Sequence, residues 1–260
     1  MTPLDRSSDR AIYRQIADDL RADITGGVHG PGDRLPSESD LVARYKVNRR
    51  TVQHAFALLI AEGLVYSEHG SGRFVQGRPP VRRLASDRFA RRHRRAGKAA
   101  FTVEMEQAGR AYDPATDVEM LDLRTGPAPD PIAGRLGLTG DGDRVLIRAR
   151  RYVVEGLPLQ VATSYVPLDL AEGTAIMETD TGPGGIYARL EEAGHRLTRI
   201  TEDLAVEVAA EPVQRLLKLP VGAPVIHLVR TAFAGDRAVE VCDTYLNATA
   251  FELSYELPAR

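Results

Sequence analysis

The chain has 260 residues, of which 43% are hydrophobic and 27% charged, a composition typical of globular proteins with a packed core. No apolar run approaches the roughly 18 residues of a membrane span, and the N-terminus lacks the apolar stretch of an export signal. The single cysteine, Cys242, excludes an intrachain disulfide and a cysteine-rich zinc site. We therefore expect a cytoplasmic protein of two domains, with no metal, no cofactor and no membrane partner.

The charge is divided unevenly along the chain. The formal net charge is −2, yet residues 1–98 hold 19 Lys and Arg against 11 Asp and Glu, or +8, and the remainder carries −10. Eight of the positive residues lie in residues 82–98, directly after Pro79-Pro80. Two halves of opposite net charge indicate two domains with different partners. We interpret residues 79–98 as a basic interdomain linker; the alternative is a strap that contacts nucleic-acid phosphates or the acidic half.

The first domain, residues 1–78, begins with three predicted helices. Apolar residues recur every four positions over residues 11–25, and Gly26-Gly27 ends that helix. Ser37 and Asp40 have the spacing of a capping box and open a second helix that carries Leu41, Val42 and Tyr45. Asn48 is a good N-cap for a third helix, which ends at Gly63 and buries Val52, Phe56, Leu59 and Ile60.

Two short strands follow the helices. Residues 64–67 and 73–76 flank a glycine-rich turn, so the whole unit is predicted to be a winged helix-turn-helix. Such a fold places the start of its recognition helix in the major groove of DNA. Arg49 and Gln53 lie one helical turn apart there, and their side chains suit guanine and adenine edges. The predicted DNA-binding residues are Arg49, Arg50, Thr51 and Gln53 on the helix, Arg34 and Arg73 at phosphates, and His69 and Gly70 at the wing tip.

The stretch GDRLPSESDLVARYKVNRRTVQHAFALLIAEGLVYSEHGSGRFV resembles the winged-helix domain of the GntR family of bacterial transcription regulators, over about residues 10–77. The resemblance implies that a homodimer binds an inverted repeat in double-stranded DNA. By position it implies base or phosphate contacts for Arg49 and Thr51, and phosphate contacts for Arg34 and Ser37. Gln53 departs from the family pattern, in which this position is commonly Arg, so the base read there is expected to differ.

The second domain, residues 99–260, is predicted to be α+β with an antiparallel sheet. Two hairpins are expected, 145–154 with 157–166 and 225–234 with 238–246, together with a half-buried strand over 197–209. Short helices are expected over 186–190, after Gly184-Gly185, and over 212–219.

This order resembles the effector-sensing UTRA domain of the HutC subgroup of that family, whose fold is similar to chorismate lyase. The resemblance rests on RYVVEGLPLQVATSYVP, GGIYARLEEAGHRLTRITEDL, LPVGAPVIHLVRTAF and VCDTYLNATAFELSYEL. It implies a small-molecule ligand that alters DNA affinity, bound by pocket residues Arg150, Thr163, Ser164, Tyr165, Glu202, Arg230 and Tyr245. The chain departs from sugar-phosphate sensors of the group by placing Tyr152 and Ala162 where those often have Arg and Glu.

The residues themselves favour an anionic ligand. Arg150 and Arg230 can pair with a carboxylate or phosphate, and the helix after Gly184-Gly185 presents free backbone N–H groups. The alternative is that each arginine is an exposed cross-strand partner.

We expect a ligand-responsive, homodimeric repressor of transcription that is not an enzyme. One alternative is a constitutive DNA-binding protein whose C-terminal half only dimerises. The other is a lyase-like enzyme that uses Ser164, His195, His227 and Asp243, although these residues lie in no recognised nucleophile motif.

Overall fold

The computed structural model describes residues 10–30, 32–68, 70–76, 80–84, 87–140 and 142–256. The chain divides into two compact units, Met1–Pro79 (unit 1) and Pro80–Arg260 (unit 2), each with its own hydrophobic core. Within the described ranges, no helix combines the length and the apolar character that crossing a membrane requires.

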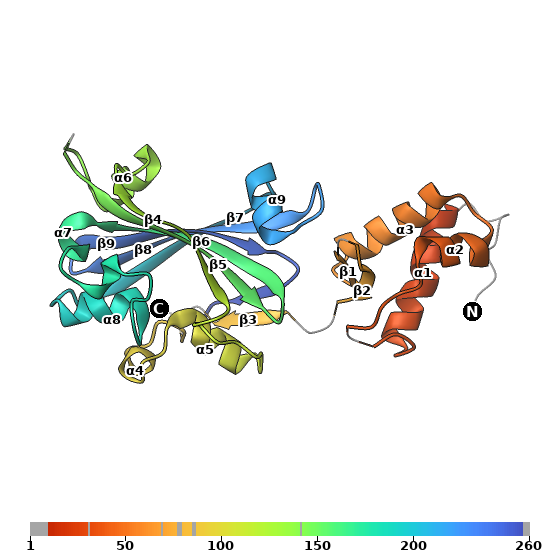
Figure 1. Ribbon diagram of the computed structural model, residues 1–260, viewed down its shortest axis with the longest axis horizontal. Coiled ribbons are helices and arrows are strands. Elements are labelled where there is room, and N and C mark those ends of the chain that lie inside the picture. Colours follow the sequence, from red (N-terminus) through yellow and green to blue (C-terminus); the bar gives the residue numbers. More distant parts are fainter. Residues whose placement is uncertain are drawn as a thin grey trace. The chain divides into compact units, whose positions relative to one another are not determined.

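Unit 1 contains three helices and a two-stranded wing (Figure 1). The helices are α1 (Ile12–Thr25), α2 (Glu38–Tyr45) and α3 (Arg49–Ala61), and β1 (Val65–Glu68) pairs antiparallel with β2 (Gly72–Val75). The predicted apolar stripes form the core, which includes Ile16, Leu20, Leu41, Val52, Phe56 and Leu59. Both predicted helix starts are confirmed, because Ser37 and Asp40 form a complete capping box and Asn48 caps α3.

Unit 2 is built on a six-stranded antiparallel sheet. The strand order is β4-β5-β6-β9-β8-β7, with the strands β4 (Val118–Gly126), β5 (Val145–Val154), β6 (Leu157–Pro167), β7 (Arg199–Val208), β8 (Pro224–Ala234) and β9 (Arg237–Asn247). The sequence predicts the antiparallel character of this sheet and five of its strands, but not β4. Both predicted hairpins are present, β5 with β6 and β8 with β9. The fold class is therefore confirmed.

Helices cover both faces of this sheet. On one face, α5 (Ala100–Gln107) and α8 (Gly185–Glu192) bury Phe101, Met105 and Ile186 against it. On the other face lie α6 (Asp130–Leu136) and α9 (Glu211–Leu217), and Figure 1 shows these two pairs of helices on opposite sides of the sheet. Three shorter segments, α4 (Arg91–Arg95), α7 (Leu168–Ala171) and η1 (Ala175–Met177), complete the helices of the described residues.

The basic segment is not the linker that its composition suggests. Residues from Pro80 onward belong to unit 2, and β3 (Val81–Leu84) pairs in parallel with β10 (Phe251–Ser254), which buries Val81 and Arg83. Seven of its eight basic side chains have an acidic partner: Arg92 pairs with Asp87 inside the segment, and the other six pair with residues of the acidic half, a contact that the alternative interpretation included. Residues 1–79 alone hold 11 basic and 10 acidic residues, so unit 1 carries only +1.

The edge strand β7 is more exposed than predicted. Its alternation suggested a half-buried strand, yet Leu204, Val206 and Val208 are 42%, 74% and 65% exposed. The strand pairs along its whole length with β8, and no strand of the described residues pairs with its other edge. Apolar and polar residues do alternate along the end of β7, but no element of the described chain packs on these three apolar side chains.

Candidate functional site

The exposed start of α3 is the first candidate site. The Asn48 side chain accepts hydrogen bonds from the backbone N–H of Thr51 at 2.8 Å and from its hydroxyl at 3.0 Å, which fixes where the helix begins. Arg49, Arg50 and Gln53 are exposed beyond this cap, and Arg50 has no polar partner among the described residues. Thr51 is half-buried and its hydroxyl is committed to Asn48.

Glu38, at the start of α2, joins three of the predicted DNA-binding side chains. Its carboxylate accepts from Arg49 Nε at 2.5 Å, from Gln53 Nε2 at 3.1 Å and from Arg73 Nη2 at 2.6 Å. Partial burial raises the pKa of Glu38, but the hydrogen bonds from Arg49 and Arg73 outweigh it and hold the pKa below its usual value of 4.5. Sequence reasoning missed Glu38, because nothing local shows that α2 faces both the recognition helix and the wing.

The remaining predicted contacts surround this group. The Arg73 guanidinium lies 4.2 Å from the ring centroid of Phe56. The backbone of Arg34 forms an antiparallel β-bridge with the backbone of Phe74. A Cβ added at Gly72 would lie 3.0 Å from Arg34 Nε, so the wing backbone passes close to that side chain. Ser37 is exposed, but its hydroxyl is engaged with Asp40 in the capping box. Gly70 is exposed with a φ of 80°, and His69 lies outside the described residues.

Unit 2 contains a cavity of about 630 Å³ on the sheet face that α5 and α8 cover. Its walls include alternate residues of β4, β5, β6 and β9, Arg230 of β8, the loop of residues 179–185 with the start of α8, and part of α5; residues 112–115 and the basic segment also contribute. On β5 these are Arg148, Arg150 and Tyr152, and on β6 they are Gln160 and Ala162. Successive side chains of a strand point to opposite faces, so residues two apart meet the same cavity.

Two cavity arginines lack a carboxylate partner among the described residues. Arg148 donates to the backbone carbonyls of Ile176 at 2.6 Å, Thr179 at 3.0 Å and also Glu178. Arg150 donates to Ser164 Oγ at 2.6 Å. Burial and the neighbouring Arg150 lower the pKa of Arg148 to about 10, which still leaves it charged at neutral pH. The cavity therefore offers uncompensated positive charge, although Asp180 also lines it.

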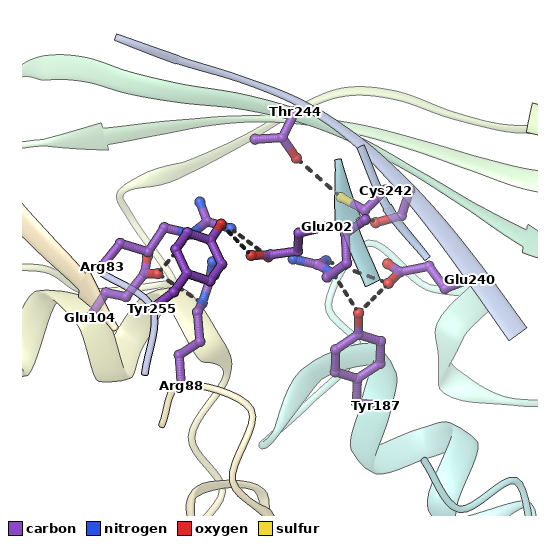
Figure 2. Close-up of polar contacts among 11 residues, drawn as sticks. Arg83, Arg88, Glu104, Tyr187, Glu202, Glu240, Cys242, Thr244 and Tyr255 are labelled. Atoms are coloured by element: carbon purple, nitrogen blue, oxygen red, sulfur yellow. Dashed lines mark hydrogen bonds and ion pairs between the residues drawn. The ribbon is translucent and has the colours of Figure 1, made fainter. Parts of the chain in front are cut away.

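The other two cavity arginines are ion-paired (Figure 2). Arg230 Nε donates to the Tyr187 hydroxyl at 2.8 Å, which donates to Glu240 at 2.5 Å, and Arg230 Nη2 lies 3.5 Å from Glu240. Arg88 Nε lies 2.8 Å from Glu104 Oε1, while burial and the nearby Arg83 lower the pKa of Arg88 to about 10. Figure 2 shows Glu104 with Arg83 and Arg88 beside the pair of Tyr187 and Glu240.

The predicted pocket residues divide between the two faces of the sheet. Arg150 and Arg230 line the cavity, and Ser164 holds Arg150 from the same face. Glu202 is buried nearby, where it accepts a hydrogen bond from Tyr255 and lies 3.5 Å from Arg83 Nη2. The other three do not line the cavity, because alternation points them to the opposite face: Thr163, Tyr165 and Tyr245.

The residues considered for a catalytic triad do not come together. His227 Nε2 lies 2.7 Å from Asp243 Oδ1, and the His227 ring stacks on Tyr245 at 4.5 Å. Ser164 instead points to the cavity side of the sheet, where it contacts Arg150 and Cys242. His227 and Asp243 therefore form a partly exposed pair on the other face of the sheet from Ser164.

Sequence reasoning missed several cavity residues. Arg148, Tyr152 and Gln160 follow from Arg150 and Ser164 by the two-residue period of a strand, a signal that was available. Arg88 and Gly97 come from the basic segment, and their approach to the sheet depends on the pairing of β3 with β10, which no local pattern reveals.

Comparison with known proteins gives matches for both units. Residues 12–75 match the family model described as bacterial regulatory proteins, gntR family, and residues 112–252 match the UTRA domain. The chain is 32% identical over 250 residues to the uncharacterized HTH-type transcriptional regulator SCO4628 of Streptomyces coelicolor, covering 94% of this chain and 91% of that protein.

Two further matches span most of the chain. The HTH-type transcriptional repressor NagR of Bacillus subtilis is 26% identical over 251 residues, covering 96% of this chain and 90% of the repressor. The crystal structure of PhnF from Mycobacterium smegmatis matches with a TM-score of 0.59 at 20% identity. The match covers 96% of this chain and 100% of the PhnF chain. This structural likeness supports the fold.

Proposed function

Because this chain belongs to the GntR family of bacterial regulatory proteins and carries a UTRA domain, we propose that it is a homodimeric repressor that binds an inverted-repeat operator and responds to a small anionic ligand. The observation that carries this proposal is the cavity with Arg148 and Arg150, neither of which forms an ion pair with a carboxylate of the described residues.

The start of α3 supports DNA binding. The guanidinium of Arg49 can donate two hydrogen bonds to a guanine edge in the major groove, and the amide of Gln53 suits an adenine edge. Arg34 and Arg73 lie at the wing and provide positive charge for phosphates. Since unit 1 carries only +1, affinity must come from the placement of these side chains rather than from a large overall charge.

The exposed edge of β7 supports a homodimer. A long edge strand with exposed apolar side chains invites pairing with another strand, and Leu204, Val206 and Val208 supply such a surface. A second copy would present the same strand about a two-fold axis, as an isologous interface requires. Two recognition helices related by that axis match an inverted repeat.

The cavity favours regulation by a ligand over constitutive DNA binding. Arg148 is buried and Arg150 is half-buried, and they donate only to carbonyls and a hydroxyl, so each keeps a charge that no ion pair offsets, which is costly inside a protein. An anionic ligand would relieve that cost. The direct test is an operator selected from a random duplex pool, with DNA affinity measured as organic anions are added; a constitutive protein would show no change with any of them.

A further inference from the structure

The cavity face of β5 and β6 is ordered in rows along the strands. Arg148 pairs with Ser164, Arg150 pairs with Ala162, and Tyr152 pairs with Gln160. Successive rows on one face are two residues, or about 6.8 Å, apart. The cavity therefore changes from positive charge at the first two rows to an aromatic and an amide group at the third.

The side chain of Gln160 contains a buried oxygen without a hydrogen-bond partner among the described residues. It is 5% exposed, its side chain lines the cavity, and its Oε1 has no hydrogen bond within the described residues. Buried side-chain amides are nearly always hydrogen-bonded, because an unpaired one loses its bonds to water without replacing them. The Nε atoms of Arg148 and Arg150 are also buried without a hydrogen bond. All three side chains belong to the same cavity wall.

The wall beside Gln160 is apolar and aromatic. The ring of Phe101 lies 4.6 Å from the ring of Tyr152 and 5.0 Å from that of Tyr112, and all three line the cavity. Val118 and Met120 extend this wall. A sugar body would need a hydrogen-bond partner for each buried hydroxyl, which such a wall provides poorly. A flat apolar ring would stack on it.

We propose that the cavity selects a cyclic carboxylate with an apolar ring and a hydrogen-bonding substituent opposite the carboxylate, held by Arg148 and Arg150 at one end and by Gln160 at the other. Arg150 and Gln160 belong to successive rows of the same face, so substituents on opposite sides of one ring face different side chains of this wall. This inference rests on the proposed function, since it names the class of ligand to which the regulator responds.

The test is a thermal-shift and calorimetric comparison on the full chain with matched probes. 4-Hydroxybenzoate and 4-hydroxyphenylacetate are compared with benzoate and phenylacetate, which lack the far hydroxyl, and with glucose 6-phosphate and glucosamine 6-phosphate. The hydroxylated carboxylates are expected to stabilise the protein most, since a site built to bond a hydroxyl discriminates against an analogue without it.

Gln160→Met is the informative variant, and Gln107→Met is its control because the Gln107 amide is exposed and bonds Asp87 outside the cavity wall. Gln160→Met is expected to weaken binding of the hydroxylated probes about tenfold and that of their unsubstituted partners less than about twofold. Gln160→Leu serves in its place where circular dichroism shows that the first variant is unfolded.

Three outcomes separate this inference from the proposed function. An unchanged ratio between hydroxylated and unsubstituted probes in Gln160→Met overturns the role of Gln160. Binding of sugar phosphates alone overturns the carboxylate class, while the proposed function stands. Binding of any probe that is unaffected by Arg150→Met, or binding of no probe, contradicts an anion site in this cavity and so counts against both.

Discussion

Arg88 Nε lies 2.8 Å from Glu104 Oε1, and this contact joins the wall of the cavity to the strand that opens unit 2. Glu104 Oε1 also lies 3.4 Å from Arg83 Nε on β3, and both Arg83 and Glu104 are almost completely buried. Figure 2 shows Arg83 and Arg88 on either side of Glu104. One carboxylate thus serves two buried guanidinium groups, one of which faces the cavity.

Replacing Glu104 with Gln is expected to destabilise unit 2 by about 3–5 kcal/mol, because it leaves two buried arginines without their shared counter-charge. Urea unfolding measured by circular dichroism checks this. Glu106→Gln is the matched control, since Glu106 lies two residues away on the surface and pairs with Lys98 at 2.6 Å. It is expected to cost less than about 1 kcal/mol. Equal effects of the two variants would contradict the importance of the buried cluster.

Arg49→Ala is expected to weaken operator binding by about 1–3 kcal/mol and to relax specificity at a single base pair. The physical reason is the loss of a fork-shaped donor at the start of α3, where it is exposed to the groove. Fluorescence anisotropy on the selected operator and on single-base variants measures both effects. A uniform loss over all sequences would show instead that Arg49 contacts a phosphate.

Acid is expected to remove the stabilisation that Glu38 provides to unit 1. The folded-state pKa of Glu38 is lowered, so this contribution is fully present above the unfolded-state pKa and is lost as the pH falls through the folded-state pKa. The difference in unfolding midpoint between wild type and Glu38→Gln should stay constant from pH 7 to about pH 5 and shrink below it. A difference that disappears already near neutral pH would contradict the role of this carboxylate.

Val206→Lys is expected to shift the protein from dimer to monomer, because it places a charge in the centre of the exposed apolar surface of β7. Light scattering after size-exclusion chromatography measures the mass directly. Val221→Lys is the control, since Val221 is even more exposed and lies in the turn before β8. A dimer that survives Val206→Lys but not Val221→Lys would place the interface elsewhere.

Local signals predicted most of the fold. Ser37 with Asp40, Asn48 and the Glu155-Gly156 turn each mark an element that the structure contains, because capping and turn geometry depend on neighbouring residues. The interpretation of the basic segment as a linker was wrong for the opposite reason. The partner strand of Arg83 lies about 170 residues further along the chain, and composition does not reveal such a pairing.

The candidate sites were predicted in part. The DNA-binding surface follows from the helix order, but the junction at Glu38 depends on how α2 packs beside α3 and the wing. In the cavity, Arg150 and Ser164 were named together with Thr163 and Tyr165, although three consecutive residues of a strand cannot share a face. Applying the period of two to Arg150 would have selected Arg148 and Tyr152 instead.

The central claim is that an anion bound beside Arg148 and Arg150 changes the affinity of this protein for DNA. The most direct measurement is the Kd for the selected operator with and without a compound that raises the melting temperature of the full chain. At least a tenfold change in Kd is expected in the wild type and none in Arg150→Met. A stabilising compound that leaves the wild-type Kd unchanged would contradict it.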